Sequence, residues 1–155
     1  MSLAAALCIA GVNAVELDCT FDKKLPAGVS INGNLQQEDG TTVLVNENKY
    51  YSMIVTFPGE DNVTGTLTIE LTSAGNPAGM LGIILHEQLS NGKTKQLKNY
   101  AWMRKVAQDK YQTMTFTIAP EMLKAGKKYS IYFYRNGKGA LKIKRVQFKT
   151  TPVAK

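Results

Sequence analysis

Hydrophobic and polar residues alternate along most of the chain after residue 15. In VTGTLTIELT, Leu67, Ile69 and Leu71 alternate with threonine and glutamate, which is the pattern of a strand with one buried face and one solvated face. The same alternation recurs in YSMIVTF, MLGIILHEQ, QTMTFTI and LKIKRVQF. In the last of these segments the apolar phase slips at Arg145, which predicts a β-bulge. The chain is therefore expected to consist mostly of strands.

Turn signals separate the alternating segments. They are Pro58-Gly59 with Asp61-Asn62, Gly75-Asn76-Pro77, Asn91-Gly92 and Asn136-Gly137. The two Asn-Gly pairs predict type I′ hairpin turns, because both central residues of that turn need a positive φ. A helical turn is expected only in PEMLKAG, residues 120–126, where proline comes first and glycine last.

Eight to ten short strands with regular turns predict an all-β fold, an antiparallel β-sandwich. A jelly roll is favoured over an immunoglobulin-like sandwich, because the Cys, Trp and Cys framework of antibody domains is absent.

The stretch KYSIYFYRNGKG, residues 128–139, carries aromatic residues on both faces of a predicted strand. Tyr129, Ile131 and Phe133 share one face, because side chains alternate along a strand. Tyr132 and Tyr134 share the other. The first face is expected to join the core, and the second needs either a ligand or a covering loop.

The first fourteen residues differ in character from the rest. LAAALCIAGVNA is a small and apolar run whose end resembles a signal-peptidase site. We expect residues 1–14 to be a residual signal peptide or an added arm, and residues 15–155 to form a single β-sandwich domain that is secreted or periplasmic. The run is too short to span a bilayer, so no stable membrane insertion is expected. Cys8 lies within it and leaves Cys19 alone, so no internal disulfide is expected in the mature chain.

Charge is distributed unevenly along the chain, whose formal net charge is +7. Residues 1–92 hold three basic and ten acidic residues, a net −7, whereas residues 93–155 hold sixteen basic and two acidic residues, a net +14. Only three of the nineteen basic residues are arginine, on which base reading relies, so no nucleic-acid partner is expected.

A binder of acidic polysaccharide would bring two lysine groups together. These groups are Lys142, Lys144 and Lys149 in one, and Lys93, Lys95 and Lys98 in the other. The alternative is that strands from the two halves of the chain interleave in the fold and their charges mix.

Assembled catalytic motifs are absent from the sequence. His86 is the only histidine, no Gly-x-Ser-x-Gly motif occurs, and nothing points to a pair of carboxylates. A histidine-rich metal site is excluded for the same reason. The chain is therefore not expected to be an enzyme.

Aromatic and polar residues lie on the faces of three predicted strands that are opposite the apolar faces. The candidate ligand-binding residues are Trp102, Tyr100, Arg104, Tyr132, Tyr134, His86 and Gln88. If these faces adjoin, they form a platform of planar rings flanked by hydrogen-bond donors, on which the apolar C–H faces of a sugar can stack. The alternative is that Trp102 and the tyrosines cover a sheet face under a loop.

Most of the chain after residue 15 also resembles a known family of binding domains. The resemblance is carried by LDCTFDKKLPAGVSINGN, KYYSMIVTF, GMLGIILHEQLSNGKTKQLKNYAW, KYQTMTFTI and PEMLKAGKKYSIYFYRNGKGALKIKRVQF. Together these segments resemble the jelly-roll carbohydrate-binding modules of the galactose-binding-like type. The resemblance implies a carbohydrate ligand, and a glycoside hydrolase domain in the same or another chain as a partner. The charge distribution adds acidic polysaccharide as a candidate ligand.

Many modules of this type hold a structural calcium ion through acids near the first and last strands. This chain has Glu16, Asp18 and Asp22 early, but its last strand, LKIKRVQFKT, has no acid. Calcium needs oxygen ligands from several segments. The sequence supplies only part of such a site, and no cofactor is expected.

These observations favour a secreted, non-catalytic carbohydrate-binding domain that uses an aromatic platform on a sheet face. A structural or protein-interaction sandwich of the cell envelope is the first alternative, and an electrostatic binder of acidic polymers is the second. An open groove of rings would favour sugar, whereas a flat apolar patch would favour a protein partner.

Replacement of Trp102, the only tryptophan, tests the platform. Trp102→Ala is expected to abolish sugar binding and to leave the free energy of unfolding nearly unchanged, because a platform ring is exposed. A buried tryptophan would instead cost about 3–5 kcal/mol on removal. Chemical denaturation together with a polysaccharide pull-down separates the two outcomes, and strong destabilisation would remove Trp102 from the site.

Overall fold

The computed structural model describes residues 14–21, 24–31, 35–38, 41–44, 51–74, 80–103, 110–136 and 140–154. The strands are β1 (Glu16–Thr20), β2 (Val29–Ile31), β3 (Leu35–Glu38), β4 (Thr41–Leu44), β5 (Tyr51–Pro58), β6 (Val63–Ala74), β7 (Met80–Gln88), β8 (Thr94–Met103), β9 (Gln112–Ile118), β10 (Lys128–Asn136) and β11 (Ala140–Pro152). A short 3₁₀ turn, η1 (Pro120–Met122), occupies the segment in which a helical turn is predicted.

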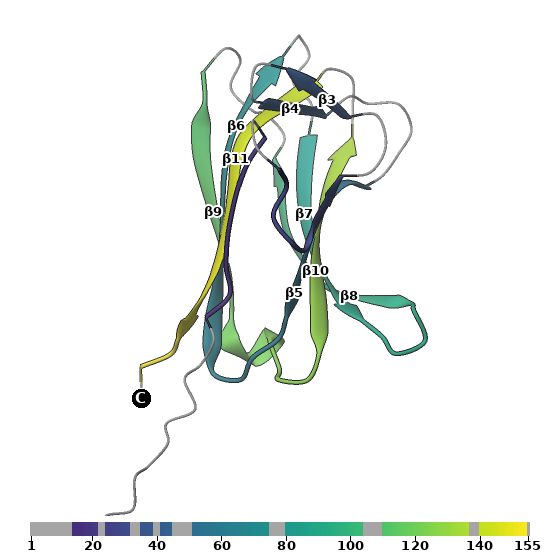
Figure 1. Cartoon of the computed structure of the whole chain (residues 1–155), viewed down its shortest axis with the longest axis vertical. Helices are drawn as coiled ribbons and strands as arrows, with labels where there is room; N and C mark the ends of the chain where they lie inside the picture. Colours follow the sequence, from purple (N-terminus) through teal and green to yellow (C-terminus); the bar gives the residue numbers. More distant parts are fainter. Residues whose placement is uncertain are drawn as a thin grey trace, which may run out of the picture.

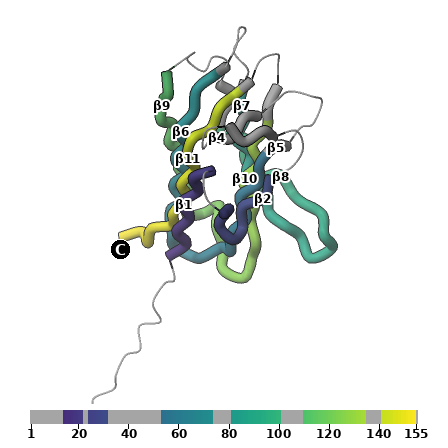
Figure 2. Tube along the Cα trace, turned by 45° about the horizontal axis from the view of Figure 1, so that its top comes forward, coloured from purple at the N-terminus to yellow at the C-terminus, as the bar shows by residue number. Residues whose placement is uncertain are grey.

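The strands form two antiparallel sheets that face each other (Figure 1). Sheet A has the order β3-β4-β11-β6-β9, with β1 also paired to β11, and sheet B has the order β2-β5-β10-β7-β8. Figure 2 shows β1 beside β11 in one sheet and β2 beside β5 at the edge of the other. From β5 onward the chain changes sheet at nearly every connection. The predicted antiparallel β-sandwich is thus confirmed, with the jelly-roll arrangement that was favoured.

The predicted apolar faces fill the space between the sheets. Phe57 of sheet B and Phe148 of sheet A meet with their ring centroids 4.3 Å apart. On β10, Tyr129, Ile131 and Phe133 are at most 1% exposed. The other buried core residues include Met53, Val55, Leu67, Ile69, Leu71, Leu81, Ile83, Leu85, Leu141, Ile143 and Val146. One continuous core therefore joins the two sheets.

Bulges bend two of the strands. The register of β11 against β6 shifts between Ile143 and Arg145, which makes Lys144 the extra residue and confirms the predicted bulge. On β8 the register against β7 shifts twice, so that Leu97 and Tyr100 have no single partner. Both of these residues are partly buried and pack against the core. The end of this β7–β8 hairpin extends away from the sandwich (Figure 1).

The turn of the β7–β8 hairpin differs from the predicted type I′. Gly92 has φ of 78°, whereas Asn91 does not have a positive φ. The Leu89 N–H donates to the Lys93 carbonyl at 2.8 Å, and the Gly92 N–H donates to the Leu89 carbonyl at 3.0 Å. The Asn91 side chain accepts from the Lys93 N–H at 3.0 Å, so it caps a three-residue loop without entering the left-handed region. The other Asn-Gly pair, at 136–137, is not tested, because residue 137 lies outside the described residues.

Ion pairs join the two oppositely charged halves of the chain. Lys144 Nζ lies 3.2 Å from a Glu70 carboxylate oxygen, and the Arg145 guanidinium makes a two-pronged contact with Asp18, one N···O distance being 2.8 Å. The two lysine groups that would mark a single acidic-polymer face lie apart in the fold. Lys142, Lys144 and Lys149 are on β11 of sheet A, whereas Lys93, Lys95 and Lys98 belong to the β7–β8 hairpin of sheet B. The interleaving alternative therefore describes the fold.

Within the described residues, no helix has the length and apolar character needed to cross a membrane.

A pair of neighbouring substitutions on β10 tests its two faces. Phe133→Ala is expected to lower the free energy of unfolding by about 3–5 kcal/mol, because Phe133 is fully buried and its removal leaves a cavity. Tyr132→Ala, one residue away on the half-buried outer side, is expected to cost about 1 kcal/mol. Urea denaturation of both variants measures the difference, and equal losses would contradict the register of sheet B.

Candidate functional site

The outer face of sheet B is the face that points away from the core. Strand β10 runs along its middle, between β5 and β7. Across the strands, Ser130 pairs with Thr56 and His86, Tyr132 pairs with Ile54 and Ile84, and Lys128 pairs with Pro58 and Gln88. Three adjacent rows of side chains therefore combine an aromatic ring, hydroxyl groups, an amide and an ammonium group on one surface.

Two rings meet on this outer face. The Tyr132 and His86 rings lie 4.5 Å apart between centroids, at an interplanar angle of 58°. Burial lowers the pKa of His86 below its ordinary value, so the imidazole is neutral at neutral pH. His86 is only 8% exposed and both of its ring nitrogens are buried, so Tyr132 is the ring of the pair that a ligand can reach, with His86 packed beside it.

A hydrogen-bonded row lies beside the rings. The Gln88 side-chain amide donates to the Ser130 hydroxyl at 2.7 Å, and the Ser130 and Thr56 hydroxyls are 3.2 Å apart. Ser130 has no exposed surface, so it holds its two neighbours in position and cannot reach a ligand. The same burial argues against a Ser130–His86 nucleophile pair, although the two residues are in register.

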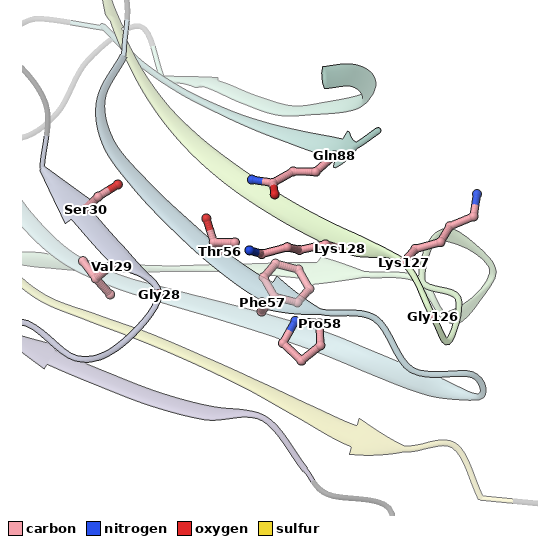
Figure 3. Close-up of a pocket in the computed structure, with 10 residues that line it drawn as sticks. All are labelled: Gly28, Val29, Ser30, Thr56, Phe57, Pro58, Gln88, Gly126, Lys127 and Lys128. Carbon is pink, nitrogen blue, oxygen red and sulfur yellow. The ribbon is translucent and has the colours of Figure 1, made fainter. Parts of the chain in front are cut away.

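A hollow of about 520 Å³ opens where this row ends. It is lined by Gly28, Val29 and Ser30 from the β2 segment, Thr56, Phe57 and Pro58 from β5, Gln88 from β7, and Gly126, Lys127 and Lys128 at the start of β10. Figure 3 shows Thr56, Gln88 and Lys128 together at its centre. Four strands and one turn thus present polar groups to a single concave region large enough for a sugar unit.

The structure places some of the predicted site residues together. Tyr132, His86 and Gln88 lie on the outer face of sheet B, and Tyr134, which is half-buried, follows on the same strand opposite Gly82. Their convergence is what the platform requires. Their role in ligand binding stays a prediction.

The structure does not place the other three predicted residues on this surface. Tyr100 is half-buried and packs against the core, because a bulge interrupts the alternation of β8, and burial raises the pKa of its hydroxyl. This placement argues against a platform role for Tyr100. The backbone of Trp102 pairs with Gly82, but its side chain lies outside what the structure describes, as does the whole of Arg104.

Of the ten residues that line the hollow, sequence reasoning named only Gln88, and the residues that it missed include Ser30, Thr56, Pro58 and Lys128. Lys128 and Thr56 do occupy outward positions of alternating segments, so their face was predictable. The pairing of β5 with β10 was not predictable, because it joins residues seventy or more positions apart.

The structure describes only some of the acids that the sequence offers to a calcium ion. The Asp18 carboxylate is engaged by Arg145, and Asp22 lies outside the described residues. Within the described ranges, no group of three or more His, Cys, Asp or Glu side chains is close enough to hold a metal ion.

Comparisons with known proteins identify the fold. No family model and no curated protein matches the chain by sequence. The CBM22-1 xylan-binding domain of Paenibacillus barcinonensis Xyn10C has a TM-score of 0.66 at 13% identity, covering 89% of this chain and 95% of that domain. The CBM22-2 xylan-binding domain of the same enzyme has a TM-score of 0.61 at 10% identity, covering 87% and 99%.

A third solved structure, the CBM22-1 and GH10 modules of Clostridium thermocellum Xyn10B, has a TM-score of 0.52 at 10% identity. It is matched over 94% of this chain and 26% of that one. The sandwich of this chain is therefore that of β-sandwich carbohydrate-binding modules, as the sequence resemblance indicated.

The burial of His86 predicts how the stability of the domain depends on pH. The pKa of His86 is lower in the folded state than in the unfolded state, so the unfolded chain binds more protons as the pH falls through and below about 6.5. The free energy of unfolding should therefore decrease from pH 7 towards pH 5. His86→Gln should lose this component, which urea titrations at several pH values would reveal. An identical pH dependence in both proteins would contradict it.

Proposed function

We propose that this chain is a non-catalytic carbohydrate-binding domain that holds a glycan on the outer face of sheet B. The observation that carries the proposal is the Tyr132–His86 ring pair beside the Gln88, Ser130 and Thr56 hydrogen-bonded row. Sugars present flat apolar C–H faces together with hydroxyl groups, and this surface offers a matching partner to each.

The structural comparisons suggest which polysaccharide to test first. The two structures with the higher TM-scores described above are xylan-binding domains, so xylan is the first polysaccharide to test. One of the matched structures joins such a domain to a GH10 module. We propose that this chain likewise serves a glycoside hydrolase in the same or another chain, and that it acts outside the cell.

The surface favours sugar over a protein partner. Large exposed hydrophobic residues in the described part of the chain are Leu89, Tyr111 and Val153. They lie in the β7–β8 turn, before β9 and after β11, respectively, so they belong to three separate segments. A docking face for a protein usually has a contiguous apolar patch. The described residues instead form a concave region that combines apolar surface with hydroxyl, amide and ammonium groups, next to the ring pair.

A matched pair of tyrosine variants tests the proposal. Tyr132→Ala should weaken binding to soluble xylan by about tenfold or more, since loss of a central aromatic contact commonly costs over 1.4 kcal/mol. Tyr111→Ala should leave binding unchanged, because Tyr111 is 37% exposed but lies beside Lys144 of sheet A. Affinity electrophoresis in xylan, with mannan and a soluble cellulose derivative for comparison, measures both.

Thermal unfolding of each variant checks that the domain remains folded. Absence of retention by every polysaccharide, or equal losses from the two variants, would overturn the proposal.

A further inference from the structure

The hollow at the end of the outer face of sheet B has a one-sided charge. Among its ten lining residues, Lys127 and Lys128 are charged, and there is no aspartate or glutamate. A neutral polysaccharide does not require this arrangement. A ligand group of opposite sign would complement this charge.

The two lysines differ in whether they form an ion pair. Lys127 Nζ lies 2.7 Å from a carboxylate oxygen of Glu87, and this hydrogen bond raises the pKa of Lys127. In the part of the chain that the structure describes, Lys128 has no such carboxylate partner. Figure 3 shows Lys128 extending back into the hollow, whereas Lys127 points away from it. Lys128 is thus the cation available to a ligand.

The groups around Lys128 fit a sugar ring. The Thr56 and Ser30 hydroxyls and the Gln88 amide can exchange hydrogen bonds with ring hydroxyls, and Pro58 is an exposed apolar ring in the same hollow. One ammonium group with neutral donors and an apolar wall suits a single carboxylate on a pyranose. A polyphosphate chain would need a row of cations along its path.

A second hollow of about 610 Å³ extends the positive region. It is lined by Glu87 to Asn91 and shares Gln88, Gly126, Lys127 and Lys128 with the first. Its one acid, Glu87, is already paired with Lys127. The adjoining hairpin carries Lys93, Lys95 and Lys98, which are all exposed. These charges raise the local positive potential and favour the approach of an anionic chain.

We propose that this hollow binds the carboxylate of a uronic acid residue in the glycan, with Lys128 as the contacting cation. The inference rests on the proposed function and names the ligand class for one part of the same surface. Lys128 lies four residues from Tyr132 on β10, about 13 Å along the strand. The ring pair and Lys128 therefore engage different sugar units of one chain.

The test compares glucuronoxylan with the same polymer after chemical reduction of its carboxyl groups, so that only the charge differs. Calorimetry should show that the wild-type domain binds the native polymer about threefold to tenfold more tightly, the range expected for one partly exposed charge-assisted contact. This advantage should shrink between 50 and 500 mM NaCl, because salt screens exposed charges.

Lysine variants locate the effect. Lys128→Met should bind native glucuronoxylan no more tightly than the reduced polymer, with affinity for the reduced polymer unchanged. Lys128→Arg should restore most of the preference. Lys149→Met, an exposed lysine of sheet A, should behave as wild type.

The outcomes separate the two proposals. Equal binding of native and reduced polymer by the wild type would overturn this inference and leave carbohydrate binding intact, whereas binding of neither polymer would overturn the proposed function itself. Lys128→Met that loses both polymers equally would also count against the inference. If heparin or single-stranded DNA binds as tightly as glucuronoxylan with the same dependence on Lys128, the carboxylate assignment is wrong.

Discussion

Apolar burial along β10 sets the register on which the rest of sheet B depends. Tyr129, Ile131 and Phe133 are almost fully buried, and a slip of one residue would turn all three to solvent. The start of the strand is fixed further, because the Tyr129 hydroxyl accepts a hydrogen bond from the Lys124 N–H at 2.9 Å. Gly59 packs so closely that an added Cβ would lie 2.4 Å from the Tyr129 ring. With the inner face held in this way, Lys128, Ser130 and Tyr132 must point outward.

The outer face gains its rigidity from a polar row that is itself buried. Ser130 is in contact with Thr56 and Gln88 and has no exposed surface. Its hydrogen bonds satisfy a hydroxyl that would otherwise carry a desolvation cost of about 1–3 kcal/mol. The polar groups at the margin of the row are therefore held in place in the free protein, which would reduce the entropy lost if they bind the proposed ligand.

The sequence was sufficient to predict which face of each strand is buried, but not which strands lie next to each other. Alternation correctly assigned the buried side of β6 and β10, and the phase slip at Arg145 correctly indicated a bulge. The alternation rule failed for Tyr100, because a bulge on β8 turns its ring towards the core. No local residue pattern predicts that bulge. The prediction of a type I′ turn was wrong, because the Asn91 side chain caps the loop by accepting a hydrogen bond from the Lys93 N–H. The Asn-Gly pair alone does not reveal this hydrogen bond.

Strand pairing is the information that local patterns lack. Thr56 lies beside Ser130 only because β5 and β10 are adjacent, and the choice of neighbour is decided by the packing of the whole core. His86 and Tyr132 were both recognised as outward residues, yet their contact follows from the adjacency of β7 and β10. For a site built from several strands, local patterns can thus identify the outward residues. They cannot predict which of these residues meet, because that depends on strand pairing.

The same constraint explains how one sandwich can serve different ligands. Core positions are restricted by volume and polarity, and the fold is retained at 13% identity to a xylan-binding domain. Outward positions are not restricted in this way, so their chemistry can change without cost to the fold. In this chain the ion pairs of Lys127, Lys144 and Arg145 each join a base from the second half to an acid from the first. Lys128 differs because its cross-strand neighbours on β5 and β7 are Pro58 and Gln88, neither of which is acidic. Its charge is therefore directed at the surface where the proposed glycan would lie.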